Sequence, residues 1–221
     1  MGEGMEDQVE LWSATDQARA IRDGNLTSRE LLERILYRIH AVNPTLNAVV
    51  TLDEEGARRQ ADAADDEALR GAWRGPLHGL PITVKDALEV MGMRSTGGSQ
   101  ALADHIPAQD ASAVRAVRDA GAVIIGKTNV PEWSGDIQTF NPLFGTTHNP
   151  WDTARVPGGS SGGAATAVAC GMSAFEIGTD IGGSIRNPAH FVGIYGHKPS
   201  FGLVPQRGYL DHVGGGTIDA D

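Results

Sequence analysis

The chain has 221 residues, of which 40% are hydrophobic and 21% are charged, so it is long enough and apolar enough to form a globular core. Its formal net charge of −10 argues against direct binding of nucleic acid, because phosphate recognition needs clustered Lys and Arg. No long block of either sign occurs, so the acidic balance indicates a solvated surface.

The N-terminal residues 1–12 are acidic and lack the positive, then apolar, pattern of a secretory leader. Nowhere does the sequence approach the roughly 18 consecutive apolar residues that a membrane helix needs. The single cysteine, Cys170, excludes an internal disulfide, and its apolar surroundings in the sequence favour a small buried side chain. We therefore expect a cytoplasmic protein with no membrane partner.

Residues 1–70 predict a helical lead-in. Ser13 can cap a first helix that stops at Gly24. Residues 27–30 form a capping-box pattern, and residues 54–70 predict a third, more exposed helix. The capping box is followed by an apolar stripe at helical spacing, made of Leu31, Leu32, Ile35, Leu36 and Ile39.

From residue 75 onward, short apolar runs alternate with helical patterns. This alternation predicts an α/β fold with helices packed on a sheet. No internal repeat or linker is visible, so we interpret 1–221 as one domain with its core motifs in 75–210. The predicted elements are strands over 80–84, 123–125 and 172–177, and helices over 111–120 and 162–170.

The C-terminal residues 214–221, GGGTIDAD, predict a flexible tail with no closing helix or strand. A complete domain more often ties its last element into the core, so we expect the fold to be incomplete at the C-terminus. Finding whether the coding sequence continues in frame after Asp221 tests this expectation.

Two short motifs match familiar patterns but conflict with their context. Residues 121–128, GAVIIGKT, satisfy a nucleotide-binding pattern, yet their β-type interior cannot wrap a phosphate and Pro131 opposes the helix that should follow. Residues 158–162, GGSSG, satisfy the nucleophile-elbow pattern of α/β-hydrolases, although no buried strand is predicted before them. Histidines occur later in the chain, so Ser160 as an elbow nucleophile stays open as an alternative.

Four longer motifs carry a more specific signal. They are GLPITVKD at 79–86, GKTNVPEW at 126–133, VPGGSSGGAA at 156–165 and GTDIGGSIRNPA at 178–189. With these motifs the chain resembles the amidase signature family over roughly residues 75–210, and the spacing of Ser160 and Ser184 agrees with that resemblance. The resemblance implies a mixed β-sheet core flanked by helices and hydrolysis of a carboxamide C–N bond.

Matched residue by residue, the resemblance implies a catalytic Ser–Ser–Lys triad. Ser184 is then the nucleophile, Lys85 the base, and Ser160 the bridge between them, preceded by a cis bond from Gly159. The chemistry agrees, because a serine hydroxyl needs a base and burial can lower the pKa of a lysine by several units. Lys127 also lies at a predicted strand end; the resemblance favours Lys85 and leaves Lys127 solvated or structural.

The resemblance also implies an oxyanion hole formed by the backbone N–H groups of Ile181, Gly182 and Gly183, next to that of Ser184. Paired glycines let a backbone curl into such an anion-binding nest. We expect three neighbours either to support the site or to serve folding alone: Ser161, Asp180 and Arg186.

Three functions compete at this stage. The leading one is an amidase that releases a carboxylic acid and ammonia or amine through a Ser184 acyl-enzyme. The second is the glutaminase subunit of a tRNA-dependent amidotransferase, which would need partner subunits, and the third is a catalytically inert fragment. We expect a small-molecule amide as substrate, no cofactor, and no metal, because the histidines are scattered. The sequence does not determine whether the protein forms a homo-oligomer.

The substrate pocket is the least predictable feature. A polar loop over 129–141 is a candidate to border the substrate. Four aromatic residues could favour an aromatic acyl group, but packing in the core is the preferred interpretation. They are Trp133, Phe140, Phe144 and Trp151.

Overall fold

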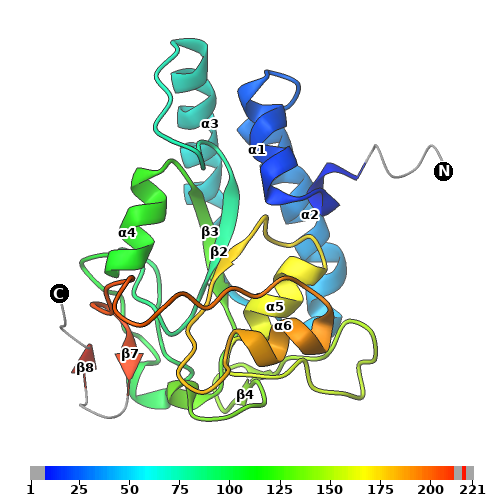
Figure 1. Ribbon diagram of the computed structural model, residues 1–221, viewed down its shortest axis with the longest axis vertical. Coiled ribbons are helices and arrows are strands. Elements are labelled where there is room, and N and C mark those ends of the chain that lie inside the picture. Colours follow the sequence, from blue (N-terminus) through cyan, green and yellow to red (C-terminus); the bar gives the residue numbers. More distant parts are fainter. Residues whose placement is uncertain (1–7, 212–215, 218–221) are drawn as a thin grey trace.

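A four-stranded mixed sheet forms the centre of the molecule, in the order β1-β3-β2-β6. The computed structural model describes residues 8–211 and 216–217. In the sheet, β2 runs parallel to β3 and β6, whereas β1 runs antiparallel to β3. The mixed sheet flanked by helices is thus confirmed (Figure 1). The strands are β1 (Val49–Leu52), β2 (Pro81–Lys85), β3 (Val123–Thr128) and β6 (Glu176–Ile177).

Helices cover both faces of this sheet. The second begins with the predicted capping box: the Thr27 hydroxyl accepts from the Glu30 N–H, and the Glu30 carboxylate accepts from the Thr27 N–H at 2.9 Å. No helix within the described residues is long and apolar enough to cross a membrane. The helices are α1 (Ala14–Arg22), α2 (Ser28–Leu46), α3 (Glu54–Leu69), α4 (Ser112–Asp119), α5 (Gly162–Ala169) and α6 (Arg186–Val192). Short 3-10 turns are η1 (Val9–Leu11), η2 (Gln100–Leu102) and η3 (Glu132–Ser134).

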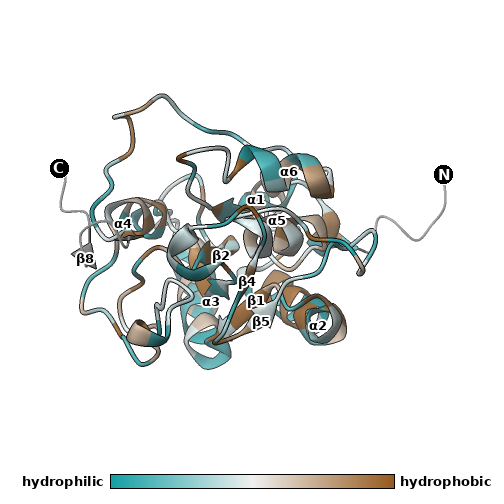
Figure 2. Ribbon diagram, turned by 90° about the horizontal axis from the view of Figure 1, so that it is seen from below, coloured by the Kyte–Doolittle hydropathy of each residue, from teal (hydrophilic) through white to brown (hydrophobic). Residues whose placement is uncertain are grey.

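The apolar core is divided by the sheet, since successive strand residues face opposite sides. In β3, Val123 and Ile125 pack with the apolar stripe of α2, whereas Ile124 packs on the other face. Ile82 and Val84 of β2 join Ile124 in that second cluster. Seen from below, hydrophobic residues colour the central strands brown (Figure 2). The alternate residues of β2, Thr83 and Lys85, therefore lie on the α2 side of the sheet.

Several elements differ from their prediction. No sequence signal predicted β1 or α6, and the strand predicted over 172–177 shrinks to the two residues of β6. Part of the predicted flexible tail is ordered, since β8 (Gly216–Thr217) pairs with β7 (Leu210–Asp211). The other residues of that tail lie outside the described residues. A second two-stranded unit joins β4 (Phe140–Asn141) to β5 (Gly145–Thr146).

The expectation that four aromatic residues pack in the core is wrong. Trp151 is 78% exposed and Phe140 48% exposed, and Trp133 and Phe144 are only half-buried. The reason is that they belong to a long connection between β3 and α5, and such connections run over the surface. Cys170, by contrast, is buried and unpaired as predicted.

Candidate active site

Lys85 occupies the last position of β2, at the carboxyl end of the parallel strands, where open α/β sheets commonly bind ligands. Its side chain is completely buried. The Nζ atom lies 2.7 Å from Ser160 Oγ and 2.6 Å from Thr179 Oγ1. The structure therefore brings together two of the three predicted triad residues and adds Thr179, which the sequence did not single out.

Burial governs the proton affinity of this lysine. Loss of water lowers the pKa of Lys85 to about 7, although the charges of Asp180 and Glu176 act in the opposite direction. Its hydrogen-bond partners are hydroxyl groups and no carboxylate contacts it directly among the described residues. Near neutral pH the amine is thus poised to lose and regain a proton.

Ser160 is completely buried and follows a cis peptide bond at Gly159–Ser160, as the resemblance implies. The neighbouring backbone fits against it closely: a Cβ atom on Gly159 would lie 2.7 Å from the carbonyl carbon of Ile137. At the start of α6, Asn187 Oδ1 accepts from the Gly159 N–H at 3.2 Å. These contacts hold the Ser160 hydroxyl against the lysine.

Ser184 lies beside this segment through its backbone. The Ser161 N–H donates to the Ser184 carbonyl at 3.1 Å. Ser161 also hydrogen-bonds within the site as expected, because its hydroxyl donates to the Thr179 carbonyl at 3.3 Å. The Ser184 hydroxyl itself makes no hydrogen bond to any described residue. The contact from Ser160 to Ser184 that a relay needs is therefore absent from the described hydrogen bonds.

The glycine-rich loop before Ser184 presents free backbone donors. Within the described part of the chain, the N–H groups of Ile181, Gly182 and Ser184 have no acceptor. The Gly183 N–H, in contrast, donates to Asp180 Oδ1 at 2.7 Å. Of the three predicted oxyanion-hole donors, Ile181 and Gly182 are thus available and Gly183 is already engaged.

Asp180 organises this loop. Its carboxylate pairs with Arg186 at 3.0 Å and also accepts from the Ile185 N–H at 3.1 Å. Although burial opposes ionisation, the hydrogen bonds from Arg186 and from the loop backbone hold the pKa of Asp180 well below its usual value. Asp180 is therefore a fixed negative charge around which the loop folds.

Lys127 is also completely buried, so the expectation that it is solvated is wrong and the structural alternative is right. It lies opposite Val84 in the sheet, and its side chain consequently points to the other face from Lys85. Its Nζ atom donates to Asp86 Oδ1 at 3.0 Å, to Ser95 Oγ at 2.8 Å and to the Leu88 carbonyl at 2.8 Å. Burial lowers the pKa of Lys127 while Asp86 opposes the change.

Three polar residues of the loop over 129–141 serve the fold. Asn129, Thr139 and Asn141 are buried. Asn141 Nδ2 donates to Asn129 Oδ1 at 2.7 Å, and Thr139 Oγ1 donates to the Gly158 carbonyl at 2.9 Å. These bonds fasten the loop to the segment that carries Ser160.

The backbone structure decides against both short motifs, the nucleotide-binding pattern and the nucleophile elbow. The Gly-Lys-Thr of the nucleotide-binding pattern, residues 126–128, lies inside strand β3 and forms no loop. A nucleophile elbow must follow a strand directly, yet no strand lies between Thr147 and Ser160, all of which are described. Neither pattern has the local structure that its chemistry requires.

A family profile described as Amidase matches residues 30–217. This chain belongs to the amidase family. It is 45% identical over 206 residues to a glutamyl-tRNA(Gln) amidotransferase subunit from Roseiflexus sp. (strain RS-1), a match that covers 90% of this chain and 42% of that protein. The indoleacetamide hydrolase of Bradyrhizobium diazoefficiens is 47% identical over 194 residues, covering 88% of this chain and 37% of that protein.

Solved structures of amidases share the fold. The crystal structure of the peptide amidase from Stenotrophomonas maltophilia superposes with a TM-score of 0.85 at 39% identity, covering 89% of this chain and 42% of that one. A crystal structure described as amidase gives a TM-score of 0.85 at 45% identity, covering 90% and 45%. The chain thus spans less than half the length of these relatives.

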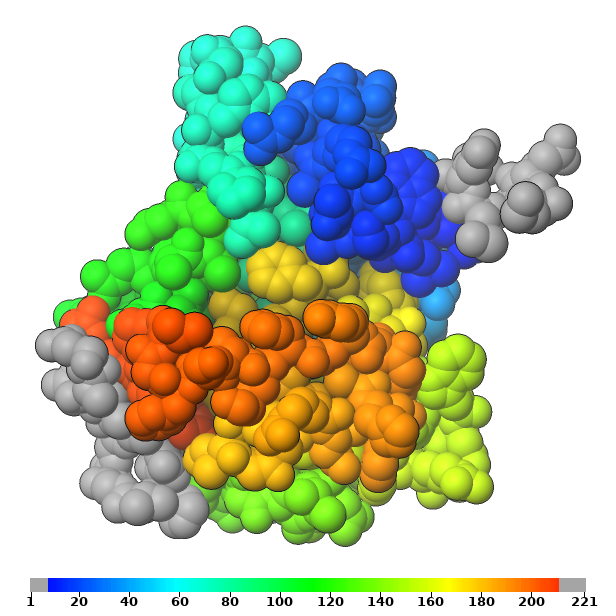
Figure 3. All heavy atoms as spheres, viewed as in Figure 1, coloured from blue at the N-terminus to red at the C-terminus, as the bar shows by residue number. Residues whose placement is uncertain are grey.

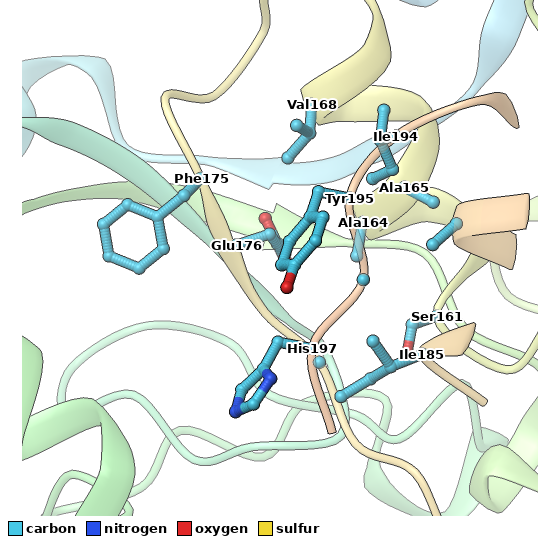
Figure 4. Close-up of a pocket in the computed structure, with 13 residues that line it drawn as sticks. Ser161, Ala164, Ala165, Val168, Phe175, Glu176, Ile185, Ile194, Tyr195 and His197 are labelled. Atoms are coloured by element: carbon cyan, nitrogen blue, oxygen red, sulfur yellow. The ribbon is translucent and has the colours of Figure 1, made fainter. Parts of the chain in front are cut away.

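Two cavities lie beside the glycine-rich loop. The larger, about 320 Å³, is lined by Thr179, Asp180 and Ile181 and by the segment over 197–206. That segment crosses the face of the molecule in orange in Figure 3. The smaller, about 220 Å³, contains Ser161, Glu176 and His197 (Figure 4).

Glu176 lines both cavities and is a second residue that the sequence did not reveal. In the sequence it is one acidic residue among many, outside the four motifs. Its hydrogen-bond partners are threonines distant in the chain, so no local signal could have found it. Thr179, in contrast, lies inside a motif and could have been considered.

Proposed function

We propose that the protein containing this chain hydrolyses carboxamide C–N bonds with Ser184 as nucleophile, Ser160 as proton bridge and Lys85 as base. The observation that carries this proposal is a completely buried lysine whose Nζ contacts the Ser160 hydroxyl at 2.7 Å. The hydrogen bond from the Ser161 N–H to the Ser184 carbonyl adds support, because it keeps the segments that carry Ser160 and Ser184 adjacent.

The base must first be neutral. With its pKa lowered to about 7 by burial, Lys85 loses its proton at ordinary pH. One remaining N–H then donates to Thr179 Oγ1, and the lone pair is left for the Ser160 hydroxyl. Ser160 passes its proton to Lys85 as it takes one from Ser184, which makes the Ser184 oxygen nucleophilic.

This relay requires the Ser184 side chain to turn toward Ser160. Hydrogen bonds at active sites often form fully only in the substrate complex, so the open contact is compatible with the mechanism. The Ser184 oxygen attacks the amide carbonyl, and the N–H groups of Ile181 and Gly182 stabilise the oxyanion. The proton then returns through Ser160 to the leaving nitrogen. Water next hydrolyses the acyl-enzyme to the acid and restores the Ser184 hydroxyl.

The substrate is proposed as a small carboxamide. The relatives named above carry two different activities in their names, indoleacetamide hydrolysis and a role within a glutamyl-tRNA(Gln) amidotransferase. A glutaminase subunit therefore remains the second candidate. Ammonia release from glutamine alone, with a partner subunit that copurifies, would favour it; release from indole-3-acetamide or other simple amides would favour the free amidase.

The deciding experiment treats the purified protein with a fluorophosphonate probe and maps the labelled peptide by mass spectrometry. Circular dichroism on the same sample checks folding. We expect label on Ser184 in the native protein and none in Ser184→Ala. Label on Ser160 would contradict the assigned nucleophile, and the absence of label on a folded protein would favour the inert fragment.

A further inference from the structure

Glu176 places a carboxyl group on the same face of the sheet as Lys85. Thr83 and Lys85 are alternate residues of β2 and share a face. Thr128 of β3 lies directly opposite Lys85, and Glu176 of β6 lies directly opposite Thr83. Because residues paired across adjacent strands point the same way, all four side chains project into one layer.

The carboxyl group is held in that layer by both neighbouring strands. The Thr83 hydroxyl donates to Glu176 Oε2, and the Thr128 hydroxyl donates to Oε1 at 2.7 Å. The side chain thus crosses β2 from the edge strand to reach β3, passing beside the position of Lys85. Only two residue pairs join β6 to β2, so these hydrogen bonds also fix the strand that leads into Thr179.

The titratable groups near Glu176 lie on several neighbouring elements, and one of them, Lys127, points to the opposite face of the sheet. Loss of water raises the pKa of Glu176 to about 7, against the effect of the two hydroxyl donors and of the nearby lysines. The surrounding titratable groups are Lys85 on β2, Lys127 on β3 with its partner Asp86, Asp180 after β6, and His197 on the segment that closes both cavities.

We propose that Glu176 is a positioning residue for the proposed reaction: its carboxylate, fixed by Thr83 and Thr128 beside Lys85, sets the pH at which the lysine becomes a base. It touches neither Lys85 Nζ nor Ser160, and acts through the field of its charge. A negative charge beside the amine favours the ammonium form, so Glu176 keeps Lys85 from losing its proton too readily. This inference rests on the role of Lys85 in the proposed function.

The chain offers a direct test because it contains three lysines, Lys85, Lys127 and Lys198. Carbon-13 labelling of the lysine side chains gives one NMR titration curve for each, and Lys85→Met assigns the first. In Glu176→Gln, which keeps the shape of the side chain and replaces one acceptor oxygen by an NH2 donor to a threonine hydroxyl, we expect the Lys85 midpoint to fall by about one pH unit. The exposed Lys198 should not move.

A parallel measurement follows the rate of fluorophosphonate labelling at Ser184 against pH. The acidic limb of this profile should move down together with the NMR midpoint. Glu67→Gln, a charge removal on α3 where Glu67 pairs with Arg74, is the matched control and should leave both curves unchanged. An unaltered Lys85 midpoint in folded Glu176→Gln overturns the inference, whereas failure of the native protein to label overturns the proposed function alone.

A second variant keeps the test decisive if Glu176→Gln does not fold. Thr128→Val removes one hydroxyl that stabilises the carboxylate and leaves both Lys85 partners in place. Glu176 is then more readily protonated, and the Lys85 midpoint should fall by less than in Glu176→Gln but in the same direction. A midpoint that stays or rises in Thr128→Val contradicts the proposal.

Discussion

Two buried lysines, one on each face of the central sheet, show how local partners decide what a buried amine does. Lys127 contacts the Asp86 carboxylate at 3.0 Å and two further acceptors, so its ammonium charge is compensated where it lies. Lys85 contacts two hydroxyl groups and no carboxylate among the described residues. Burial lowers the pKa of both amines; at Lys127 the contacting Asp86 carboxylate opposes that change, whereas at Lys85 the opposing charges of Asp180 and Glu176 act without a hydrogen bond to the amine. Lys127 is therefore suited to a structural role and Lys85 to proton transfer.

The largest expected effect separates these two roles by activity. Lys85→Met removes the proposed base and should reduce the rate of Ser184 labelling by about 10²–10⁴-fold, the usual contribution of a general base. The free energy of unfolding of this variant should change little or increase, because the substitution removes a buried amine that has no carboxylate partner. Labelling rates and urea denaturation of the same sample measure both quantities. Equal loss of labelling in folded Lys85→Met and Lys127→Met would contradict the assignment of the base.

The second prediction is that substitution of the other lysine, Lys127, lowers stability rather than activity. Lys127→Met leaves the Asp86 carboxylate buried without its cation, and breaking a buried pair in this way costs about 3–5 kcal/mol. We expect a large drop in the urea midpoint but only a modest change in the labelling rate of the molecules that remain folded. The double variant Lys127→Met/Asp86→Asn should recover part of the stability. A Lys127→Met protein with native stability would contradict the structural role assigned to Lys127.

The fold could be predicted where the signals are local. The capping box and apolar stripe located α2, and alternating short runs located β2 and β3. The edge strand β1 was missed because it has only four residues, of which Val49 alone is buried, and it follows a helix after two residues. Helix α6 was missed because it is short and begins Arg-Asn-Pro, a polar sequence with little helical periodicity.

The site was predictable to the extent that motifs carried it. Lys85 and Ser160 lie 75 residues apart and meet as the resemblance implies, although residue spacing alone could not have chosen Lys85 over Lys127. The two lysines differ in the face of the sheet to which they point, and that face depends on the strand register. Glu176 lies 93 residues from Thr83 and 48 from Thr128, so only the folded chain reveals their contact. The roles of the triad residues stay predictions until the labelling experiments are done.

The next effect concerns pH. Because burial lowers the pKa of Lys85 to about 7, the amine is protonated below that value and cannot accept a proton. The labelling rate should therefore rise by about tenfold per pH unit on the acidic side and level off above pH 7. The rate in Glu67→Gln should keep the same midpoint, since that charge removal lies on α3, where Glu67 pairs with Arg74. A profile that rises only near pH 10 would mean that Lys85 behaves as an ordinary lysine.

The smallest effect tests the second hydroxyl at Lys85. Thr179→Val removes the oxygen 2.6 Å from Nζ while keeping the shape of the side chain, and the Ser161 contact to the Thr179 backbone remains. A neutral hydrogen bond contributes about 0.5–1.5 kcal/mol, so we expect a loss of labelling rate of several-fold. Ser161→Ala is the control for loss of a hydroxyl in the same region without contact to Lys85. If Thr179 orients the amine so that its lone pair faces Ser160, the loss should appear in the maximal labelling rate at high pH, where Lys85 is neutral in both proteins. A native plateau in Thr179→Val would mean that Ser160 and the burial of the lysine suffice to hold the base.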